Sequence, residues 1–154
     1  MNAAAHATGP DLADRTVVVT GATSGIGRST TAALVGAAAR VIMAVRDVDK
    51  GKAVADEITG PAPRALVDVQ PLDLADLSSV RAFADRWTGR LDIMINNAGV
   101  MSTRRSETAD GFELQLGTNH LGHFALTNLL LPHLTDRVVS VSSSAHRMGH
   151  IELN

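Results

Sequence analysis

Residues 16–27 read TVVVT followed directly by GATSGIG, and this stretch decides the fold. The β-branched run ends at Gly21, and residues that favour a helix resume just after Gly27. This order predicts a buried strand, a tight turn and the start of a helix. Such a turn points backbone amides outward at a helix N-terminus, where the helix dipole favours negative charge, so the stretch is suited to holding a phosphate.

Three glycines give this turn its predicted shape. Gly21 lets the chain reverse, Gly25 lets a pyrophosphate approach the backbone, and Gly27 lets the helix pack close to the strand. Their spacing, G-x-x-x-G-x-G, differs from the commoner G-x-G-x-x-G, and a glycine pattern alone is weak evidence. Support for the interpretation therefore has to come from the rest of the chain.

Strands and helices are predicted to alternate along the whole sequence. Further runs typical of buried strands are residues 40–45, 65–69, 91–95 and 137–142, and helical segments are 26–39, 49–59, 78–87 and 111–131. Strands that are apolar throughout and alternate with helices indicate a parallel sheet covered on both faces. Right-handed crossovers then give an α/β fold, a Rossmann-type doubly wound parallel sheet with five strands in the order 3-2-1-4-5.

Composition excludes several classes of protein. The 154 residues fit one domain, and 14 basic against 16 acidic residues give no electrostatic footprint for nucleic acid. The chain has no cysteine, which excludes disulfides and thiolate chemistry, and no apolar run of membrane-spanning length. Residues 1–14 lack the basic start and apolar core of a secretory signal. We interpret residues 1–14 as a disordered leader, residues 15–154 as a dinucleotide-binding domain, and the protein as cytoplasmic.

The end of the second predicted strand bears on the choice of cofactor. An acidic residue there would bind the adenosine ribose hydroxyls of NAD, but this chain has Val45 followed by Arg46. A guanidinium can take a phosphate bidentately, so Arg46 favours NADP. Two alternatives stay open. Arg46 could be a solvated side chain paired with Asp47 or Asp49, and Asp47 could be the ribose ligand of NAD.

A set of short motifs resembles one family over residues 16–149. TGATSGIG at 20–27, Asp73-Leu74, NNAG at 96–99, Thr118-Asn119 and Ser142-Ser143 resemble the classical short-chain dehydrogenases/reductases in order and spacing. NHLGHF at 119–124 and VSSSAH at 141–146 look most like the retinol-dehydrogenase-like branch. The resemblance implies an oxidoreductase that moves hydride between a nicotinamide cofactor and a carbonyl or alcohol. It also implies a lipophilic substrate, such as a retinoid or steroid, and a homo-oligomer for the full-length protein.

The resemblance also implies which residues bind the cofactor. The counterpart of Asp73 accepts a hydrogen bond from the adenine amino group, with Leu74 beside the ring. The alternative is a helix cap, since Asp73 and Asp76 both precede the predicted helix 78–87. Asn97 is open between lining the ribose site and tying strands together. The full predicted set is Gly21, Thr23, Ser24, Gly25, Ile26, Gly27, Arg46, Asp73, Leu74, Asn97, Ala98 and Gly99.

Two catalytic residues are expected from the same resemblance. Ser143 would hydrogen-bond the substrate oxygen and stabilise charge developing there. Asn119 would help hold a water in the proton relay, and the alternative is a satisfied buried amide. No G-x-S-x-G elbow surrounds the serines, so a hydrolase nucleophile is not predicted. His120 and His123 lack the further ligands that a metal needs, so we expect them to pack or to line the substrate pocket.

One part of the family pattern is missing from this sequence. The family's proton donor is a tyrosine followed four residues later by a lysine, but this chain has no tyrosine and its last lysine is Lys52. We therefore expect the cofactor-binding part of an oxidoreductase, incomplete at its C-terminal end, inactive alone, and with residues 137–142 on an open sheet edge. The alternative is a Rossmann protein that binds a nucleotide or a partner without catalysis.

Overall fold

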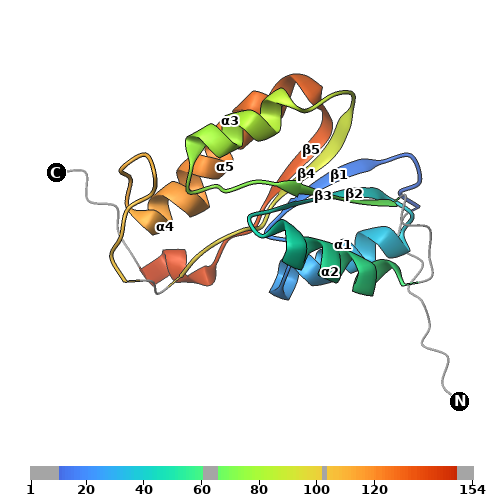
Figure 1. The fold of residues 1–154 in the computed structure, drawn as a ribbon, viewed down its shortest axis with the longest axis horizontal. Helices are drawn as coiled ribbons and strands as arrows, with labels where there is room; N and C mark the ends of the chain where they lie inside the picture. The colour runs from blue at the N-terminus through green and yellow to red at the C-terminus, as the bar shows by residue number, and fades with distance from the viewer. Residues whose placement is uncertain (1–10, 61–65, 102–103, 149–154) are drawn as a thin grey trace, which may run out of the picture.

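The five-stranded parallel sheet is confirmed. The structure, a computed structural model, describes residues 11–60, 66–101 and 104–148 (Figure 1). Its strands are β1 (Thr16–Thr20), β2 (Arg40–Val45), β3 (Val67–Pro71), β4 (Leu91–Asn96) and β5 (Leu134–Ser140). They pair in the order β3-β2-β1-β4-β5, and every pairing is parallel. The carboxyl ends of all five strands therefore meet at one edge of the sheet, where a doubly wound fold binds its ligands.

Helices cover both faces of the sheet. Figure 1 shows α1 (Gly25–Gly36) and α2 (Val48–Thr59) on one face, with α3 (Leu77–Asp85) and α5 (Gly122–Leu130) on the other. Because side chains alternate along a strand, Val17 and Val19 of β1 pack in the core on the α1 and α2 side, and Val18 packs on the other side. The three valines are fully buried, which explains the apolar run that opens the domain.

The long helix predicted over 111–131 begins later and is interrupted. Gly111 has a φ of 81° and stays outside the helix, and the carboxylate of Glu113 caps α4 (Leu114–Leu116). A π-helical turn, η2 (Gly117–Leu121), then leads into α5. Such turns are frequent at functional sites, and this one contains Asn119. A short 3-10 turn, η3 (Leu131–His133), connects α5 to β5.

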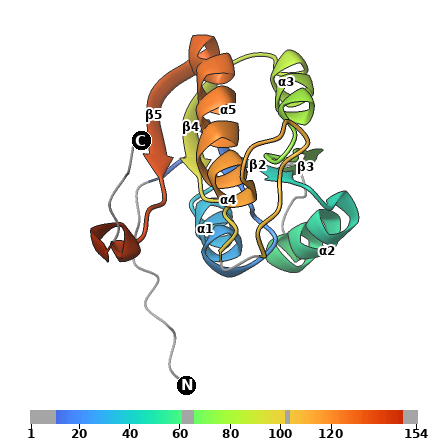
Figure 2. The same cartoon turned by 90° about the vertical axis from the view of Figure 1, so that its left-hand side faces the viewer.

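The predicted boundaries of the two edge strands were wrong. The third strand was expected at 65–69 but is Val67–Pro71, and the fifth was expected at 137–142 but is Leu134–Ser140. Both lie at edges of the sheet, where a proline or a polar side chain costs little. Ala65 of the predicted third strand lies outside the described residues. Figure 2 shows β5 beside β4 at one edge, with the turn η4 (Ser144–Met148) beyond its end.

Residues before β1 include part of the expected leader. Leu12 packs against the core on the α1 side, and its amide donates to the Ala37 carbonyl at 2.9 Å. Residues 1–10 lie outside the described residues. Within the described ranges, no helix has both the length and the apolar character needed to cross a bilayer.

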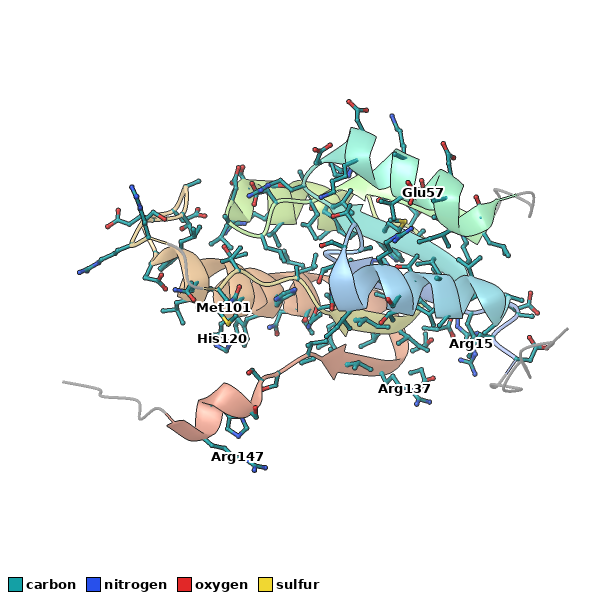
Figure 3. The ribbon with its side chains drawn as sticks, turned by 90° about the horizontal axis from the view of Figure 1, so that it is seen from below. Arg15, Glu57, Met101, His120, Arg137 and Arg147 are labelled. Carbon is teal, nitrogen blue, oxygen red and sulfur yellow. The ribbon has the colours of Figure 1, made fainter. Side chains whose placement is uncertain are left out.

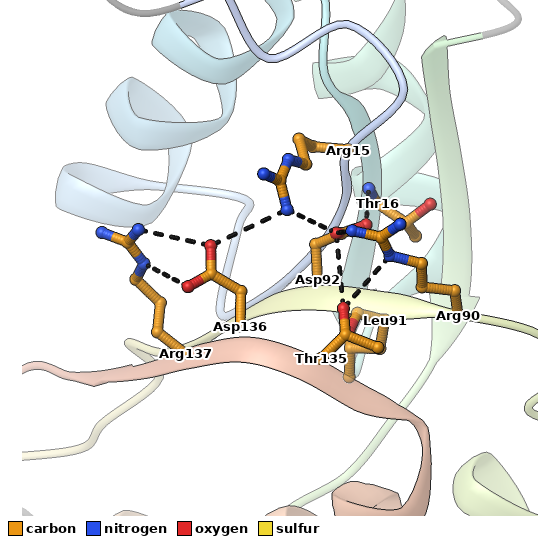
Figure 4. Close-up of polar contacts among 8 residues, drawn as sticks. All are labelled: Arg15, Thr16, Arg90, Leu91, Asp92, Thr135, Asp136 and Arg137. Atoms are coloured by element: carbon orange, nitrogen blue, oxygen red, sulfur yellow. Dashed lines mark hydrogen bonds and ion pairs between the residues drawn. The ribbon is translucent and has the colours of Figure 1, made fainter.

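The amino ends of β1, β4 and β5 are joined by a charged cluster around Asp92 (Figure 4). Asp92 is fully buried and accepts from Arg15 Nη1 at 2.8 Å and from the Thr16 amide at 3.0 Å. Arg90 also pairs with this carboxylate. Burial alone would raise the pKa of Asp92, but the hydrogen bonds from Thr16, Arg15 and Arg90 outweigh it and lower the pKa. We call Asp92, Arg15, Arg90 and the Thr16 amide the amino-end clamp.

Candidate functional site

The loop between β1 and α1 has the geometry that its glycines predict. Gly21 and Gly25 have φ values of 66° and 51°, a conformation in which side chains are strained. A Cβ on Gly27 would lie 2.4 Å from both Asn97 Nδ2 and the Gly21 carbonyl oxygen. A Cβ on Gly25 would meet nothing within 4 Å. The lack of a side chain at Gly27 therefore allows α1 to pack closely against Asn97 and Gly21, whereas no atom of the described residues covers the position of a side chain at Gly25.

The N-terminus of α1 lacks the carboxylate cap that begins α2, α3 and α4. The carboxylates of Asp47, Asp76 and Glu113 cap α2, α3 and α4, respectively. At α1 the N-cap is Ser24, whose side chain makes no cap hydrogen bond, and the first turn contains no acidic residue. The amides at the start of α1 are thus left for an anion from outside, as expected for a phosphate-binding turn.

A cleft of about 550 Å³ lies at the carboxyl edge of the sheet, between the ends of β1, β2 and β4. All twelve residues predicted to bind the cofactor line it: Gly21, Thr23, Ser24, Gly25, Ile26, Gly27, Arg46, Asp73, Leu74, Asn97, Ala98 and Gly99. We call this space the cofactor cleft. Its place at the carboxyl ends of the strands, against the β1–α1 loop, is where a doubly wound fold binds a dinucleotide.

Arg46 and Lys50 bring positive charge to one end of the cofactor cleft. Arg46 is exposed, and within the described residues its side chain forms no ion pair, so the predicted alternative of a pair with Asp47 or Asp49 is not observed. The Asp47 carboxylate accepts from the Lys50 amide at 3.0 Å as the α2 cap. Lys50 was missed by the sequence analysis, although its place four residues after Arg46, on the first turn of a helix, could have indicated it.

The sequence left Asp73 open between an adenine contact and a helix cap, and in the structure the cap is Asp76. Asp76 caps α3, accepting from the Ser78 amide at 2.8 Å, and hydrogen bonds from the Ser78 side chain and from the Ser78 amide lower the pKa of Asp76. Asp73 accepts from the Ala75 amide at 2.9 Å and lines the cofactor cleft beside buried Leu74. The helix cap is therefore Asp76, which leaves Asp73 at the cleft wall.

Asn97 has the strand-tying role considered for it and also lies at the cleft wall. Its Nδ2 donates to the Thr20 carbonyl at 2.9 Å and its own amide donates to Thr20 Oγ1 at 3.0 Å, which ties the ends of β1 and β4 together. It also lines the cofactor cleft. Thr118 lines the same cleft, and its buried Oγ1 has no hydrogen-bond partner within the described part of the chain. An orphaned hydroxyl at a cleft wall fits a site that receives a polar ligand.

Ser143 and Asn119 line a second cleft of about 770 Å³, which shares Asn97, Ala98 and Gly99 with the first. We call it the substrate cleft. The Asn119 side chain is exposed rather than buried, and it is satisfied by the backbone of Val100, with Oδ1 accepting and Nδ2 donating at 2.8 Å each. Figure 3 places the labelled Met101 and His120, which line this cleft, at the end of the molecule away from Arg15 and Arg137.

His123 also lines the substrate cleft but is buried, with 6% of its surface exposed. Burial lowers the pKa of His123, against the opposing effect of a hydrogen bond with the Asn119 carbonyl, and neighbouring His120 lowers it further. In the described ranges, no group of three or more His, Asp or Glu side chains is placed to hold a metal ion.

The fold and the two adjoining clefts define a dinucleotide-binding protein of the Rossmann type. Residues 15–154 match the family model for short chain dehydrogenases, and the chain belongs to that family. The chain is similar to retinol dehydrogenase 12 of Homo sapiens, with 50% identity over 151 residues, which cover 94% of this chain and 48% of that protein. It thus spans about half the length of the curated relatives it matches.

Two solved structures extend the comparison. A crystal structure of an uncharacterized protein from Mycobacterium Paratuberculosis has 59% identity and a TM-score of 0.86, over 94% of this chain and 52% of that one. The RhlG/NADP active-site complex of Pseudomonas aeruginosa has 29% identity and a TM-score of 0.66, over 80% of this chain and 47% of the other. Members of the family are oxidoreductases with a nicotinamide cofactor and small-molecule substrates, and the half-length coverage of this chain is consistent with their cofactor-binding portion.

Proposed function

We propose that this chain is the NADP-binding part of an oxidoreductase that transfers hydride between the nicotinamide and a carbonyl or alcohol. The observation that carries the proposal is the cofactor cleft, which all twelve predicted contact residues line, with Ser143 and Asn119 on the adjoining substrate cleft. A cofactor in the first cleft would end beside a substrate in the second, because the two clefts share Asn97, Ala98 and Gly99.

Different residues of the cofactor cleft would bind different parts of the dinucleotide. The loop at Gly25 and the uncapped start of α1 would hold the pyrophosphate. Asp73 and Leu74 would hold the adenine, and Asn97 to Gly99 would lie along the nicotinamide ribose. Thr118 Oγ1 is a further donor or acceptor at this wall. When bound, the nicotinamide supplies or accepts the hydride.

NADP is favoured over NAD by the charge beside the end of β2. Arg46 and Lys50 both line the cleft there, and a 2′-phosphate would meet two cations. Asp47, the residue that would favour NAD, has one carboxylate oxygen engaged as the α2 cap. The similarity to an NADP complex of the same fold supports the same choice.

Ser143 and Asn119 would serve the substrate. The Ser143 hydroxyl would hydrogen-bond the reacting oxygen, where charge develops. Neither a serine hydroxyl nor an amide ionises near neutral pH, so neither can deliver the proton that carbonyl reduction needs. We expect no NADPH-dependent reduction by the 154-residue chain, as followed by NADPH absorbance. Turnover that Ser143→Ala abolishes would contradict this expectation. The names of the retinol dehydrogenase relatives favour a lipophilic alcohol or aldehyde as substrate.

The test of the proposal is cofactor binding by the chain and its Arg46→Ala variant, measured by calorimetry with NADP⁺ and NAD⁺. Loss of one charge-assisted phosphate contact should weaken NADP⁺ binding by about ten- to a hundred-fold and spare NAD⁺. Arg81→Ala is the matched control, because Arg81 is an exposed arginine of α3 that lines neither cleft. Equal losses for the two cofactors would assign Arg46 a structural role, and no binding of either would refute the proposal.

A further inference from the structure

His123 joins the end of β1 to the π-helical turn through two hydrogen bonds. Its Nδ1 lies 2.9 Å from the Asn119 carbonyl oxygen, and its Nε2 lies 2.8 Å from Thr20 Oγ1. Thr20 is fully buried and directly precedes the phosphate-binding loop. The ring therefore links the loop of the cofactor cleft to the helix turn that carries Asn119.

The Asn119 end of this link determines the position of the ring proton. A carbonyl oxygen only accepts, so a contact of 2.9 Å requires that Nδ1 carry the proton and donate it. In a neutral ring, Nε2 is then an acceptor, and the Thr20 hydroxyl has to donate to it.

The Thr20 end leads independently to the same tautomer. Thr20 Oγ1 accepts from the amides of Asn97 and Ala98, both at 3.0 Å, and these two bonds use both of its lone pairs. The hydroxyl proton has two acceptors nearby, His123 Nε2 at 2.8 Å and the Ile95 carbonyl at 3.4 Å, and the shorter contact is favoured. An Nε2–H would be a third donor facing an oxygen with no lone pair left.

The hydrogen bonds of Asn119 extend this network to the substrate cleft. The Gly122 amide donates to the carbonyl of Gly117, five residues earlier, which is the hydrogen bond that defines a π-helical turn. The His123 ring is hydrogen-bonded to the carbonyl of Asn119, which lies within that turn. The Asn119 side chain in turn holds both backbone groups of Val100, which lines both clefts. A path of hydrogen bonds thus runs from Thr20 through His123 and Asn119 to Val100.

We infer that His123 is a positioning residue, held as the neutral Nδ1–H tautomer, that fixes Asn119 and Val100 relative to the phosphate-binding loop. The inference deepens the proposed function and rests on it for its catalytic meaning. The groups that face the ring from β1 and the helix turn, Thr20 and the Asn119 carbonyl, carry no charge, and His120 is the titratable neighbour that acts on it.

The first experiment needs neither a variant nor a cofactor. Long-range ¹H–¹⁵N correlation spectra of the chain report which ring nitrogen of His123 is protonated. We expect the Nδ1–H form at neutral pH, because burial lowers the pKa of His123 and so favours its neutral ring. An Nε2–H ring, or a charged ring at neutral pH, would overturn the inference whether or not the chain binds NADP⁺.

The second experiment tests the link itself with paired variants. His123→Phe removes both hydrogen bonds and keeps a ring, whereas His123→Asn keeps a donor near the position of Nδ1. We expect His123→Phe to speed hydrogen exchange of the Asn119 side-chain amide and of the Val100 amide about tenfold, and His123→Asn to restore most of the protection. His133→Phe is the control, because His133 bonds the Gly89 carbonyl at the other end of the molecule.

Cofactor affinity separates the two proposals. We expect His123→Phe to weaken NADP⁺ binding about tenfold and His133→Phe to leave it unchanged. Wild-type chain that shows the expected tautomer and protection but binds no NADP⁺ would refute the proposed function alone. Unchanged protection at Asn119 and Val100 in a folded His123→Phe variant would refute the role of His123.

Discussion

A buried carboxylate is paired at one end of the parallel sheet, and charged side chains are exposed at the other. At the amino end, the Asp92 carboxylate is fully buried and engaged by Arg15, Arg90 and the Thr16 amide (Figure 4). At the carboxyl end, Arg46 and Lys50 line an open cleft without an ion pair within the described residues. The difference supports the proposal that the charges at the amino end stabilise the fold and that those at the carboxyl end bind a ligand.

The largest expected effect is at the amino-end clamp. Asp92→Asn keeps the size of the side chain but removes the buried charge that half-buried Arg15, exposed Arg90 and the Thr16 amide contact. We expect the free energy of unfolding in urea to fall by about 3 kcal/mol, because three charge-assisted hydrogen bonds to a buried carboxylate are replaced by weaker contacts with a neutral amide. The control is Asp136→Asn, which removes a partly exposed carboxylate paired with Arg137 and should cost less than about 1 kcal/mol. Equal losses would show that burial gives Asp92 no special weight.

Acid should remove the contribution of Asp92. Its folded-state pKa is lowered from the ordinary value of 3.8, so its stabilising effect is present above that value and is lost as the pH falls through the folded-state pKa. The stability difference between wild type and Asp92→Asn should be constant near neutral pH and shrink below about pH 3.8. Urea unfolding at a series of pH values measures it. A difference that shrinks instead between pH 7 and 5 would point to another group.

The next largest effect is expected at Gly27, at the carboxyl end of the sheet, where a substitution should lower both stability and cofactor affinity. A Cβ on Gly27 would lie 2.4 Å from Asn97 Nδ2 and the Gly21 carbonyl oxygen, so Gly27→Ala should cost about 2 kcal/mol and abolish tight NADP⁺ binding. Gly36→Ala, at the other end of α1, meets nothing within 4 Å and should stabilise by up to about 1 kcal/mol. Urea unfolding and calorimetry of both variants test this contrast. A Gly27→Ala protein as stable as wild type would show that the loop can shift.

These features differ in how far the sequence predicts them. The strand, turn and helix of residues 16–36 follow from neighbouring residues, and the twelve cleft residues follow from motifs that end up at one sheet edge. The edge strands were misplaced because an exposed strand such as β5 accepts Thr135 and Asp136 as readily as valine. Their boundaries depend on pairing with a neighbour rather than on a local apolar run.

Two networks escape prediction for a different reason. The Arg15 and Asp92 side chains are 77 positions apart in the sequence, and those of Thr20 and His123 are 103 apart. A lone aspartate within an apolar strand and a histidine within a helix give no local indication of such partners. Only the parallel order of the strands brings these residues together, so the clamp and the role of His123 become visible in three dimensions.

The smallest expected effect is also the sharpest test of the difference between the two ends. Lys50 is exposed on the first turn of α2, where a positive charge opposes the helix dipole, and it lines the cofactor cleft. Lys50→Ala should therefore raise stability by a few tenths of a kcal/mol while weakening NADP⁺ binding about threefold and sparing NAD⁺. Lys52→Ala is the matched control, because Lys52 lies on the same helix, pairs with Asp49 at 3.9 Å and does not line the cleft. If Lys50→Ala raises stability and weakens NADP⁺ binding while Lys52→Ala changes neither, the charge of Lys50 serves binding rather than stability. A loss of stability at Lys50 without a change in affinity would make its charge structural, like that of the amino-end clamp.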